Sequence, residues 1–386
     1  MNPGRTSPAA EPLLETGHRF SEPAAVMRYA LQLAARGEGD VEPNPMVGAV
    51  IVDSQLRLVG QGWHEKFGGP HAEVNAFASA REIQPEQTLY VTLEPCCHTG
   101  KTPPCTEAIL KAGIRHVVVA QQDPFPEVAG KGIERLRAAG VTVEVGLLQA
   151  EARELNAPFR ALIEQKRPYV HAKWAMTWDG KISSRTGSSQ WISNTDSRRV
   201  VHQLRGRMDG ILVGVGTVRA DDPLLTARPA GPRTAVRIVL DPRATLPLES
   251  QLLTTIEQAP VLCVVGETAK KEKIAALQDA GVEVVTLPFA GEGRLDLRKL
   301  MGLLAERRMT NLLVEGGGVT LGHVFDEGLI DEAHVFLGPK LIGGEGAGTP
   351  IGGKGLPQME QAFPLEVLQT EVLAGDVYLR GRVKRS

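Results

Sequence analysis

The pattern of apolar and polar positions divides the first half of the chain into alternating strands and helices. Apolar residues recur at helical spacing over 22–36, and further helices are predicted over 72–82, 104–113 and 132–140. Short apolar runs bounded by turn residues predict strands over 46–53, 57–64, 88–94, 116–122 and 141–146. Strands that alternate with helices predict a layered α/β sheet.

The alternation begins again in the second half, after Pro168. Residues 147–166 have amphipathic helical spacing that ends at Arg167 and Pro168, so we expect a linker helix there. The second series opens with residues 169–180 and predicts further strands over 210–216, 237–241, 261–266, 282–287 and 311–318. Helices are predicted over 196–207, 273–281, 297–306 and 319–328, before a β-rich tail.

These patterns predict two domains and two connecting segments. The opening residues carry Pro, Ser and several glutamates, which is typical of a disordered extension. We expect a disordered N-terminal extension over 1–21, a first domain over 22–146, a linker helix over 147–167 and a second domain over 168–386.

The charge balance argues against a large nucleic acid as partner. The chain has 43 Lys and Arg against 45 Asp and Glu, so there is no overall basic field to attract a polyanion. No apolar segment reaches the roughly 20 residues that span a bilayer, and no signal peptide is recognisable. We therefore expect a cytoplasmic protein with a small-molecule substrate and with neither a nucleic-acid nor a membrane partner.

The cysteines predict a metal site. Three of the four cysteines, Cys96, Cys97 and Cys105, lie within ten residues, whereas Cys263 stands in an apolar run and is expected to be a buried strand residue. His71, Cys96 and Cys105 would hold one Zn²⁺ per chain and leave the fourth tetrahedral position open. A His-x-Glu sequence followed by Pro-Cys and a further cysteine is typical of zinc-dependent deaminases.

Glu73, two residues beyond His71, is the expected catalytic residue of that site. A carboxylate beside the metal can take a proton from the attacking water and deliver it to the ring nitrogen and the leaving ammonia. Two residues correspond to about 200° around an ideal helix, so His71 and Glu73 must lie at the mouth of the helix that follows Pro70.

The residues themselves leave several alternatives open. The cysteines and histidines could form a closed structural zinc site, although such a site has no use for Glu73. Cys97 could replace Cys96 as a ligand. His64 and His98 are expected at the surface or next to the ligands, and Asn44 is either a turn residue or a contact to a sugar.

Glycine clusters follow two predicted strands of the second half, GVGT over 214–217 and EGGG over 315–318. Glycines at such points let backbone N–H groups approach a phosphate, but they also occur in plain tight turns. The G-x-G-x-x-G pattern of dinucleotide sites is absent, because Leu321 stands where its third glycine would be.

The spacing of the metal ligands distinguishes between deaminase classes. Nucleoside and polynucleotide deaminases show Cys-x-x-Cys, whereas eight residues separate Cys96 from Cys105. The chain resembles the bifunctional deaminase–reductase family of riboflavin biosynthesis, above all in the segments GWHEKFGGPHAEV and VTLEPCCHTGKTPPC. The resemblance extends from about residue 22 to the end. It implies an α/β protein with a cytidine-deaminase-like α/β/α domain and then a dihydrofolate-reductase-like α/β domain.

The same resemblance implies two successive reactions. The first domain would hydrolyse the exocyclic amine of a phosphoribosylated diaminopyrimidinone, and the second would use NADPH to reduce the ribosyl group to ribityl. The phosphoribosylated pyrimidine is therefore the expected small-molecule substrate, Zn²⁺ and NADPH are the expected cofactors, and we expect a homo-oligomer.

The resemblance also implies site residues in the second half. Substrate contacts would come from Ser189, Arg205, Leu225, Arg228 and Glu315. NADPH contacts would come from Ala175, Trp191, Thr217, Asp221, Gly317, Gly318, Val319, Thr320 and Leu321. The fork of an arginine suits a phosphate. Without the resemblance, Trp191 could be a core residue, Arg205 an exposed helix residue and Arg228 a loop charge. Lys173 and Asp179 flank Ala175, and Pro242 departs from the family pattern at an expected NADPH contact.

Two other functions remain open at this point. One is a nucleoside or polynucleotide zinc deaminase with a nonreducing accessory domain, although 4% aromatic content does not favour a nucleic-acid surface. The other is a zinc-stabilised NADP-binding regulatory protein without catalysis. Loss of deamination on replacing Glu73 would separate the enzyme from the regulatory protein.

Overall fold

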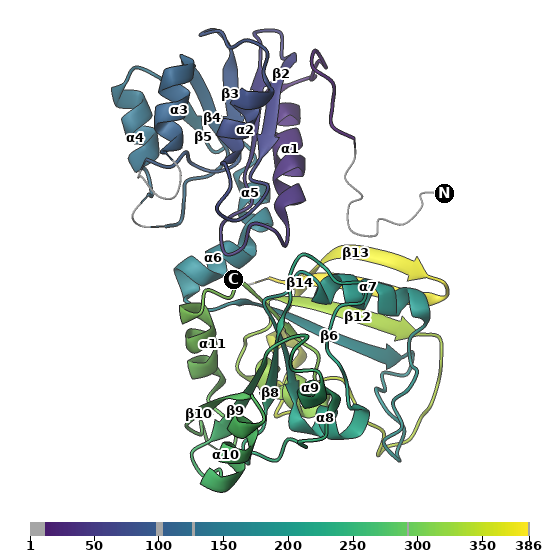
Figure 1. Cartoon of the computed structure of the whole chain (residues 1–386). Coiled ribbons are helices and arrows are strands. Elements are labelled where there is room, and N and C mark those ends of the chain that lie inside the picture. Colours follow the sequence, from purple (N-terminus) through teal and green to yellow (C-terminus); the bar gives the residue numbers. More distant parts are fainter. Residues whose placement is uncertain (1–11, 98–102, 126–127, 292, 385–386) are drawn as a thin grey trace. The chain divides into compact units, whose positions relative to one another are not determined.

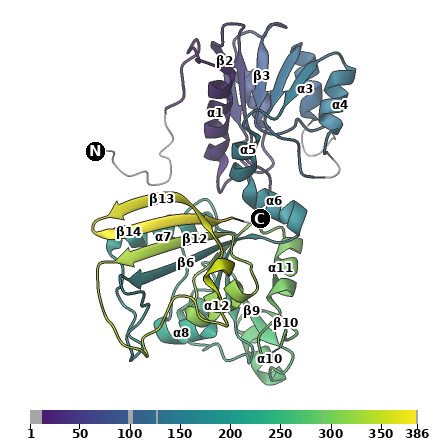
Figure 2. The same cartoon turned by 180° about the vertical axis from the view of Figure 1, so that it is seen from behind.

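The computed structural model describes residues 12–97, 103–125, 128–291 and 293–384, and they form two compact units (Figures 1 and 2). The division between the units falls between Lys166 and Arg167, next to the Pro168 that ends the expected linker. No helix in the described ranges is long and apolar enough to cross a membrane.

The first unit contains a five-stranded sheet in the order β2-β1-β3-β4-β5. Its strands are β1 (Gly48–Val52), β2 (Leu58–Trp63), β3 (Thr88–Val91), β4 (His116–Val119) and β5 (Thr142–Val145). The β1 strand is antiparallel to both β2 and β3, whereas β3, β4 and β5 are parallel. The loops after β3 and β4 therefore leave the same edge of the sheet, the edge at which α/β folds bind ligands.

Helices cover both faces of this sheet, as Figure 1 shows. Side chains of α1 (Pro23–Ala34) and α5 (Gln149–Leu155) pack on one face, and those of α2 (Ala72–Ser79), α3 (Cys105–Ala112) and α4 (Lys131–Ala138) pack on the other. A short 3-10 turn, η1 (Ala35–Gly37), extends α1. The first unit thus has the α/β/α layers of a cytidine-deaminase-like domain, as expected.

The segments on either side of the expected first domain differ from the sequence interpretation. The disordered extension is expected over 1–21, of which residues 1–11 lie outside the described residues. Within 12–21, however, the Gly17 amide donates to the Leu58 carbonyl at 2.8 Å and Phe20 is buried. The linker consists of α5 and α6 (Ala157–Gln165) and not of one helix. Asn156 separates them, and its side chain bonds both backbone groups of Met46, at 2.8 and 2.9 Å, so the linker helices belong to the first unit.

The second unit is built on a nine-stranded sheet in the order β10-β9-β8-β7-β11-β6-β12-β14-β13. The strands are β6 (Tyr169–Thr177), β7 (Gly210–Gly214), β8 (Val236–Leu240), β9 (Val261–Gly266), β10 (Glu283–Leu287), β11 (Asn311–Val314), β12 (Glu332–Gly338), β13 (Leu365–Leu373) and β14 (Asp376–Val383). The strands from β10 to β12 are parallel, and β14 and β13 extend the sheet as an antiparallel hairpin.

Helices also cover both faces of the second sheet. The side chains of α11 (Leu297–Glu306) and α12 (Gly318–Asp326) pack on one face. The opposite face is covered by α7 (Thr195–Arg205), α8 (Val215–Asp221), α9 (Gln251–Thr254) and α10 (Lys271–Asp279). The sequence did not predict α8, because Gly214 and Gly216 lie at its start and glycine disfavours helices. A 3-10 turn, η2 (Met359–Gln361), precedes β13. Cys263 is fully buried in β9, as expected.

A buried polar network lies where β6, β12 and β14 meet in this sheet. The two rings of His171 and His334 approach to 3.2 Å, and His334 also contacts Glu332 Oε1 at 3.1 Å and the Tyr378 hydroxyl at 2.8 Å. Arg380 donates to the same Glu332 oxygen at 2.5 Å. Because Arg380 already neutralises Glu332, a divalent cation here would leave a large buried positive charge. We therefore interpret the cluster as a hydrogen-bonded network and not as a second metal site.

This network makes the unfolding free energy of the second unit sensitive to acid. Burial lowers the pKa of His334 from 6.5 to about 4. Below pH 6.5, His334 binds a proton in the unfolded chain but stays neutral in the folded chain. We therefore expect the free energy of unfolding to fall as the pH drops toward 4, by up to roughly 3 kcal/mol. Thermal unfolding measured across this range in the full chain and in His334→Gln tests the expectation. An equally steep pH dependence in both proteins would show that His334 is not the cause.

Candidate functional site

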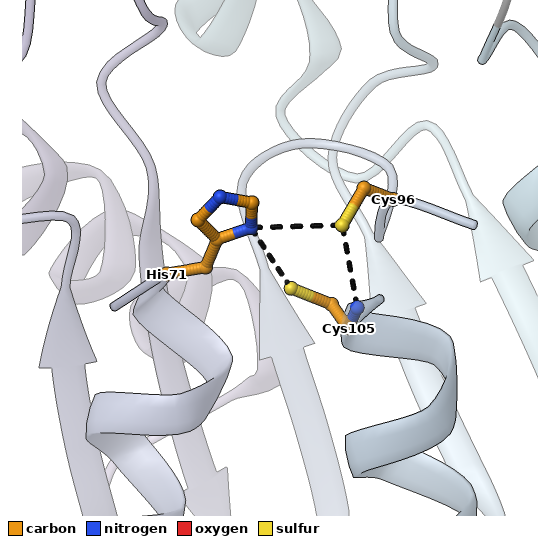
Figure 3. Close-up of side chains that lie close together, drawn as sticks. All are labelled: His71, Cys96 and Cys105. Atoms are coloured by element: carbon orange, nitrogen blue, oxygen red, sulfur yellow. Dashed lines mark hydrogen bonds between the residues drawn. The ribbon is translucent and has the colours of Figure 1, made fainter. Parts of the chain in front are cut away.

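The three expected zinc ligands come together at one edge of the first sheet, as Figure 3 shows. His71 immediately precedes α2, Cys96 lies in the loop after β3, and Cys105 is the first residue of α3. His71 Nδ1 lies 3.1 Å from Cys105 Sγ and 3.6 Å from Cys96 Sγ. Two helix starts and one loop thus place three donor atoms around a common point.

The donor set suits zinc. The three ligand atoms lie within 4.8 Å of one another, and one imidazole with two sulfurs is a combination found in catalytic zinc sites with an open fourth position. The Cys105 amide at the start of α3 donates to Cys96 Sγ at 3.3 Å. Contact between the two side chains lowers the pKa of the Cys96 thiol and raises the pKa of the Cys105 thiol, so the pair favours one thiolate, and zinc binding would release the proton that remains on the other sulfur. In the described part of the chain this cluster includes Cys96 and not Cys97, whose carbonyl accepts from Arg135.

Glu73 lies in the first turn of α2, two residues after His71, and is almost fully buried. Burial raises the pKa of its carboxyl group, and the nearby His71 opposes this effect. A carboxyl group whose pKa is shifted toward neutrality can both accept and release a proton during a reaction. The position at the mouth of α2 agrees with the geometry expected from the His-x-Glu spacing.

His64 lies next to His71 and is buried, so it is not a surface residue. Its Nδ1 contacts the Pro70 carbonyl at 3.0 Å and its Nε2 contacts the side-chain Nδ2 of Asn44 at 3.4 Å. The His64 and His71 ring centroids are 5.5 Å apart. Asn44 therefore belongs to the surroundings of the metal site and is more than a turn residue. His98 lies outside the described residues.

A buried group of charges in the second unit brings together two of the expected substrate residues. Arg205, at the end of α7, donates through Nε and NH2 to the two carboxylate oxygens of Glu315, at 2.6 and 2.9 Å. Lys173 Nζ of β6 lies 3.6 Å from Glu315. Burial alone would raise the pKa of Glu315, but the Arg205 and Lys173 cations hold it at about 2. Glu315 is therefore ionised between two cations.

Arg228 lies beside this group. Its NH1 contacts Thr226 Oγ1 at 3.2 Å, and Arg205 NH1 points to the Thr226 carbonyl at 3.4 Å. Both guanidinium groups thus contact Thr226, and partial burial and the neighbouring Arg205 lower the pKa of Arg228. The Leu225 side chain is buried in the core, so only the backbone of this expected substrate residue can face a ligand.

Four further expected site residues lie near α7 or α8. Ser189 Oγ donates to Asp221 Oδ1 at 2.9 Å, which joins an expected substrate residue to an expected cofactor residue. Trp191 is exposed and not a core residue, and the Arg198 guanidinium lies 4.5 Å from the centre of its ring. Ala175 packs beside Phe336 on the face of the sheet that α7 covers.

The EGGG cluster ends at the start of α12, and its residues have different roles. The Gly317 amide donates to Thr217 Oγ1 at 3.3 Å, so the two glycine clusters predicted from the sequence lie side by side. A Cβ on Gly318 would meet the Thr349 carbonyl oxygen at 2.5 Å, so this glycine makes room for a passing loop. Val319 is exposed, whereas Thr320 and Leu321 are buried and can face a ligand only through their backbone.

Sequence reasoning did not find the partner of Lys173 or the contacts of Thr226. Arg205 and Glu315 are 110 positions apart, and no local pattern links them. The alternation along β6 does place Lys173 and Ala175 on one face, which was the available signal for the role of Lys173.

Two family models match the chain. The model of the RibD C-terminal domain matches residues 168–379, and the model of the cytidine and deoxycytidylate deaminase zinc-binding region matches residues 21–121. The chain is 44% identical over 354 residues to riboflavin biosynthesis protein RibD of Aquifex aeolicus, which covers 92% of this chain and 96% of the relative. It is 43% identical to the protein of the same name from Actinobacillus pleuropneumoniae, over 92% of this chain and 93% of the relative.

Solved structures give the same result. RibD of Acinetobacter baumannii has a TM-score of 0.81 with 34% identity and covers 94% of this chain and 99% of its own. The diaminohydroxyphosphoribosylaminopyrimidine deaminase/5-amino-6-(5-phosphoribosylamino)uracil reductase of Thermotoga maritima has a TM-score of 0.79 with 35% identity, over 94% and 98% of the two chains.

Proposed function

Because the chain belongs to the RibD family, we propose that its two units catalyse two successive steps of riboflavin biosynthesis. The protein is a bifunctional enzyme with a zinc-dependent deaminase domain and an NADPH-dependent reductase domain. The first step converts 2,5-diamino-6-(5-phosphoribosylamino)pyrimidin-4(3H)-one to 5-amino-6-(5-phosphoribosylamino)uracil. The second step reduces the ribosyl group of that product to ribityl.

The deaminase site consists of His71, Cys96 and Cys105 as zinc ligands and Glu73 as the catalytic residue. Zinc, when bound, acts as a Lewis acid for the attack of water on the pyrimidine ring. Glu73 takes a proton from the attacking water, and it delivers protons to the ring nitrogen and to the leaving amine, which departs as ammonia. Burial excludes solvent from the Glu73 carboxyl group and keeps its pKa raised for this exchange.

The convergence of the three ligands beside Glu73 is the observation that carries this function. A structural zinc site would bind a fourth protein ligand, whereas the cluster in the described residues has three and a buried carboxylate next to them. The match to the RibD C-terminal domain does not agree with a nonreducing accessory domain, so the alternative of a simple nucleoside or polynucleotide deaminase is less well supported.

For the reductase site, we propose that Arg205 and Arg228 attract the 5′-phosphate of the substrate. Both guanidinium groups contact Thr226, and arginine binds phosphate well. Glu315 lies between Arg205 and Lys173, with Ser189 and the Leu225 backbone as further substrate contacts. NADPH, when bound, supplies the hydride that reduces the opened, imine-like sugar at C1′.

Part of the proposed NADPH site lies at the start of α12. The backbone amides of Gly317 and Gly318 and the start of α12 favour a phosphate group, and Thr217 of α8 contacts Gly317. Asp221, at the end of α8, is a further proposed contact and binds Ser189. Val319, Thr320 and Leu321 continue the same segment, and Ala175 and exposed Trp191 complete the proposed set. Catalysis in this unit is then mainly the positioning of substrate and cofactor.

We also propose that the protein forms a homo-oligomer in the cytoplasm and binds no nucleic acid. The β13 strand ends the nine-stranded sheet, and it exposes Val367 and Val372, at 69% and 70% of their surface. An open sheet edge with apolar side chains suits contact with a second copy of the chain. A monomeric mass in solution would contradict this part of the proposal, and cell fractionation would test the location.

A coupled assay tests the proposed function. The diaminopyrimidinone ribotide is supplied to zinc-loaded protein, and ammonia release is followed before NADPH is added. We expect ammonia first and then a loss of NADPH absorbance that depends on the deaminated product. A chelator added at the start should prevent ammonia release but leave the reduction of supplied deaminated product unchanged. NADPH oxidation without prior deamination would contradict the proposed order.

A further inference from the structure

Glu94 forms an unusual set of hydrogen bonds two residues before the ligand Cys96. Its side chain is buried and accepts from four backbone amides. Oε1 accepts from Gly132 at 2.9 Å and from Ile133 at 3.3 Å. Oε2 accepts from Gly130 at 2.9 Å and from Asp123 at 3.2 Å. One carboxylate thus binds the first turn of α4 and also the loop that follows β4.

The chain next to Glu94 is packed against α4 without spare room. A Cβ on Gly132 would lie 2.0 Å from the Pro95 carbonyl oxygen, so the first turn of α4 touches the backbone between Glu94 and Cys96. On the other side, the Thr106 amide of α3 donates to the Cys96 carbonyl at 3.1 Å. The segment that carries the Cys96 sulfur is therefore held between the starts of α3 and α4.

We propose that Glu94 is a positioning residue that places Cys96 for zinc binding and thereby orders the deaminase site. This inference rests on the proposed function, because it takes Cys96 as a zinc ligand. It adds a residue that neither ligates the metal nor touches the reacting atoms. The negative charge also lies at the start of α4, where backbone amides make the surroundings favourable for an anion.

A carboxylate is needed at this position, and an amide cannot replace it. Each oxygen of Glu94 accepts from two N–H groups. The NH2 group of a glutamine would point donors at two of those amides, which would force α4 or the Glu94–Cys96 segment to move. Cys96 would then leave the point where its sulfur, Cys105 and His71 converge.

The test is the zinc affinity of the full chain, measured by competition with a chromophoric chelator. We expect Glu94→Gln to weaken zinc binding by about 10–100-fold, the range for loss of a group that orients a metal ligand. Gly132→Ala should have a similar effect, because the added Cβ pushes directly on Pro95. In protein loaded with Co²⁺, the visible absorption of the metal should change in both variants, which reports altered ligand geometry.

Asp53→Asn is the matched control. Asp53 Oδ1 accepts from the Gln55 and Arg57 amides at 2.8 and 2.9 Å, in the turn between β1 and β2. Val52 pairs with Thr88, so this turn lies at the sheet edge opposite to the loop that carries Cys96. The oxygen of an asparagine side chain can still accept from both amides, so the control removes a charge at a turn but should leave zinc affinity and the Co²⁺ spectrum unchanged.

The possible outcomes separate the inference from the proposed function. If the unaltered protein bound no zinc, the proposed function would fail, and this inference with it. If the unaltered protein, Glu94→Gln and Gly132→Ala bound zinc equally well with the same Co²⁺ spectrum, only the inference would fail. If Glu94→Gln does not fold, Gly132→Ala decides alone, because it changes the same contact without removing the carboxylate.

Discussion

Replacing Glu73 by glutamine is expected to slow ammonia release by orders of magnitude while zinc stays bound. The amide keeps the size of the side chain at the mouth of α2 but cannot take or deliver a proton. Proton transfer by a positioned side chain contributes about 10²–10⁴-fold to a rate, so we expect a loss of that order in kcat. The rate of ammonia release and the zinc content of the purified variant are the two measurements.

Glu107→Gln is the matched control for this prediction. Glu107 lies two residues after the ligand Cys105, just as Glu73 lies two residues after His71, and each is in the first turn of its helix. Glu107 is half-exposed, however, and binds Arg135. Its replacement should leave deamination intact. An unchanged rate in Glu73→Gln would remove this residue from the mechanism, and loss of zinc from that variant would assign it a structural role.

In the second unit, replacing Arg205 by alanine is expected to weaken binding of the phosphorylated substrate far more than binding of NADPH. Arg205 adds positive charge where we place the phosphate, and it holds Glu315 through two hydrogen bonds. Its removal leaves Glu315 buried with Lys173 as the neighbouring cation. Loss of the charged partner of a bound phosphate costs about 2–5 kcal/mol of binding free energy, so the KM for substrate should rise by roughly 10²–10³-fold. Steady-state kinetics with each ligand varied in turn measures both KM values.

Arg199→Ala is the corresponding control, because Arg199 lies on the same helix but is exposed and pairs with Asp196 at 3.0 Å. It should change neither KM. Equal losses for substrate and NADPH in Arg205→Ala would show that the residue supports the whole fold of the site and does not serve the substrate in particular. Thermal unfolding of each variant distinguishes that case from a general loss of stability.

The contacts of Glu94 connect the deaminase site to α4. The three ligands could be found from their spacing, but their geometry depends on helices that the ligands only begin. Since Glu94 holds α4 against the chain that carries Cys96, a change far from the metal in sequence, such as one at Gly132, can reach the ligand. The expected loss of zinc affinity in these variants would show this coupling directly.

The sequence by itself predicted most of the strands and helices and the three residues that make up the candidate metal site. Apolar spacing is a local property, and it predicted most elements because each strand or helix buries one face. The His-x-Glu and cysteine spacing predicted the cluster of His71, Cys96 and Cys105, which the structure brings together. Pro168 was predicted to mark the domain boundary, and the division lies next to it.

Only the tertiary structure decided which distant residues become partners. Asn156 interrupts the linker because it bonds Met46, and Glu315 lies between Arg205 and Lys173 because β11 is next to β6 in the sheet. Gly318 permits a loop to pass, a role that its sequence cluster did not distinguish from phosphate binding. Local patterns report which face of an element is buried, whereas contacts between elements depend on strand order and loop paths, which no single stretch of sequence encodes.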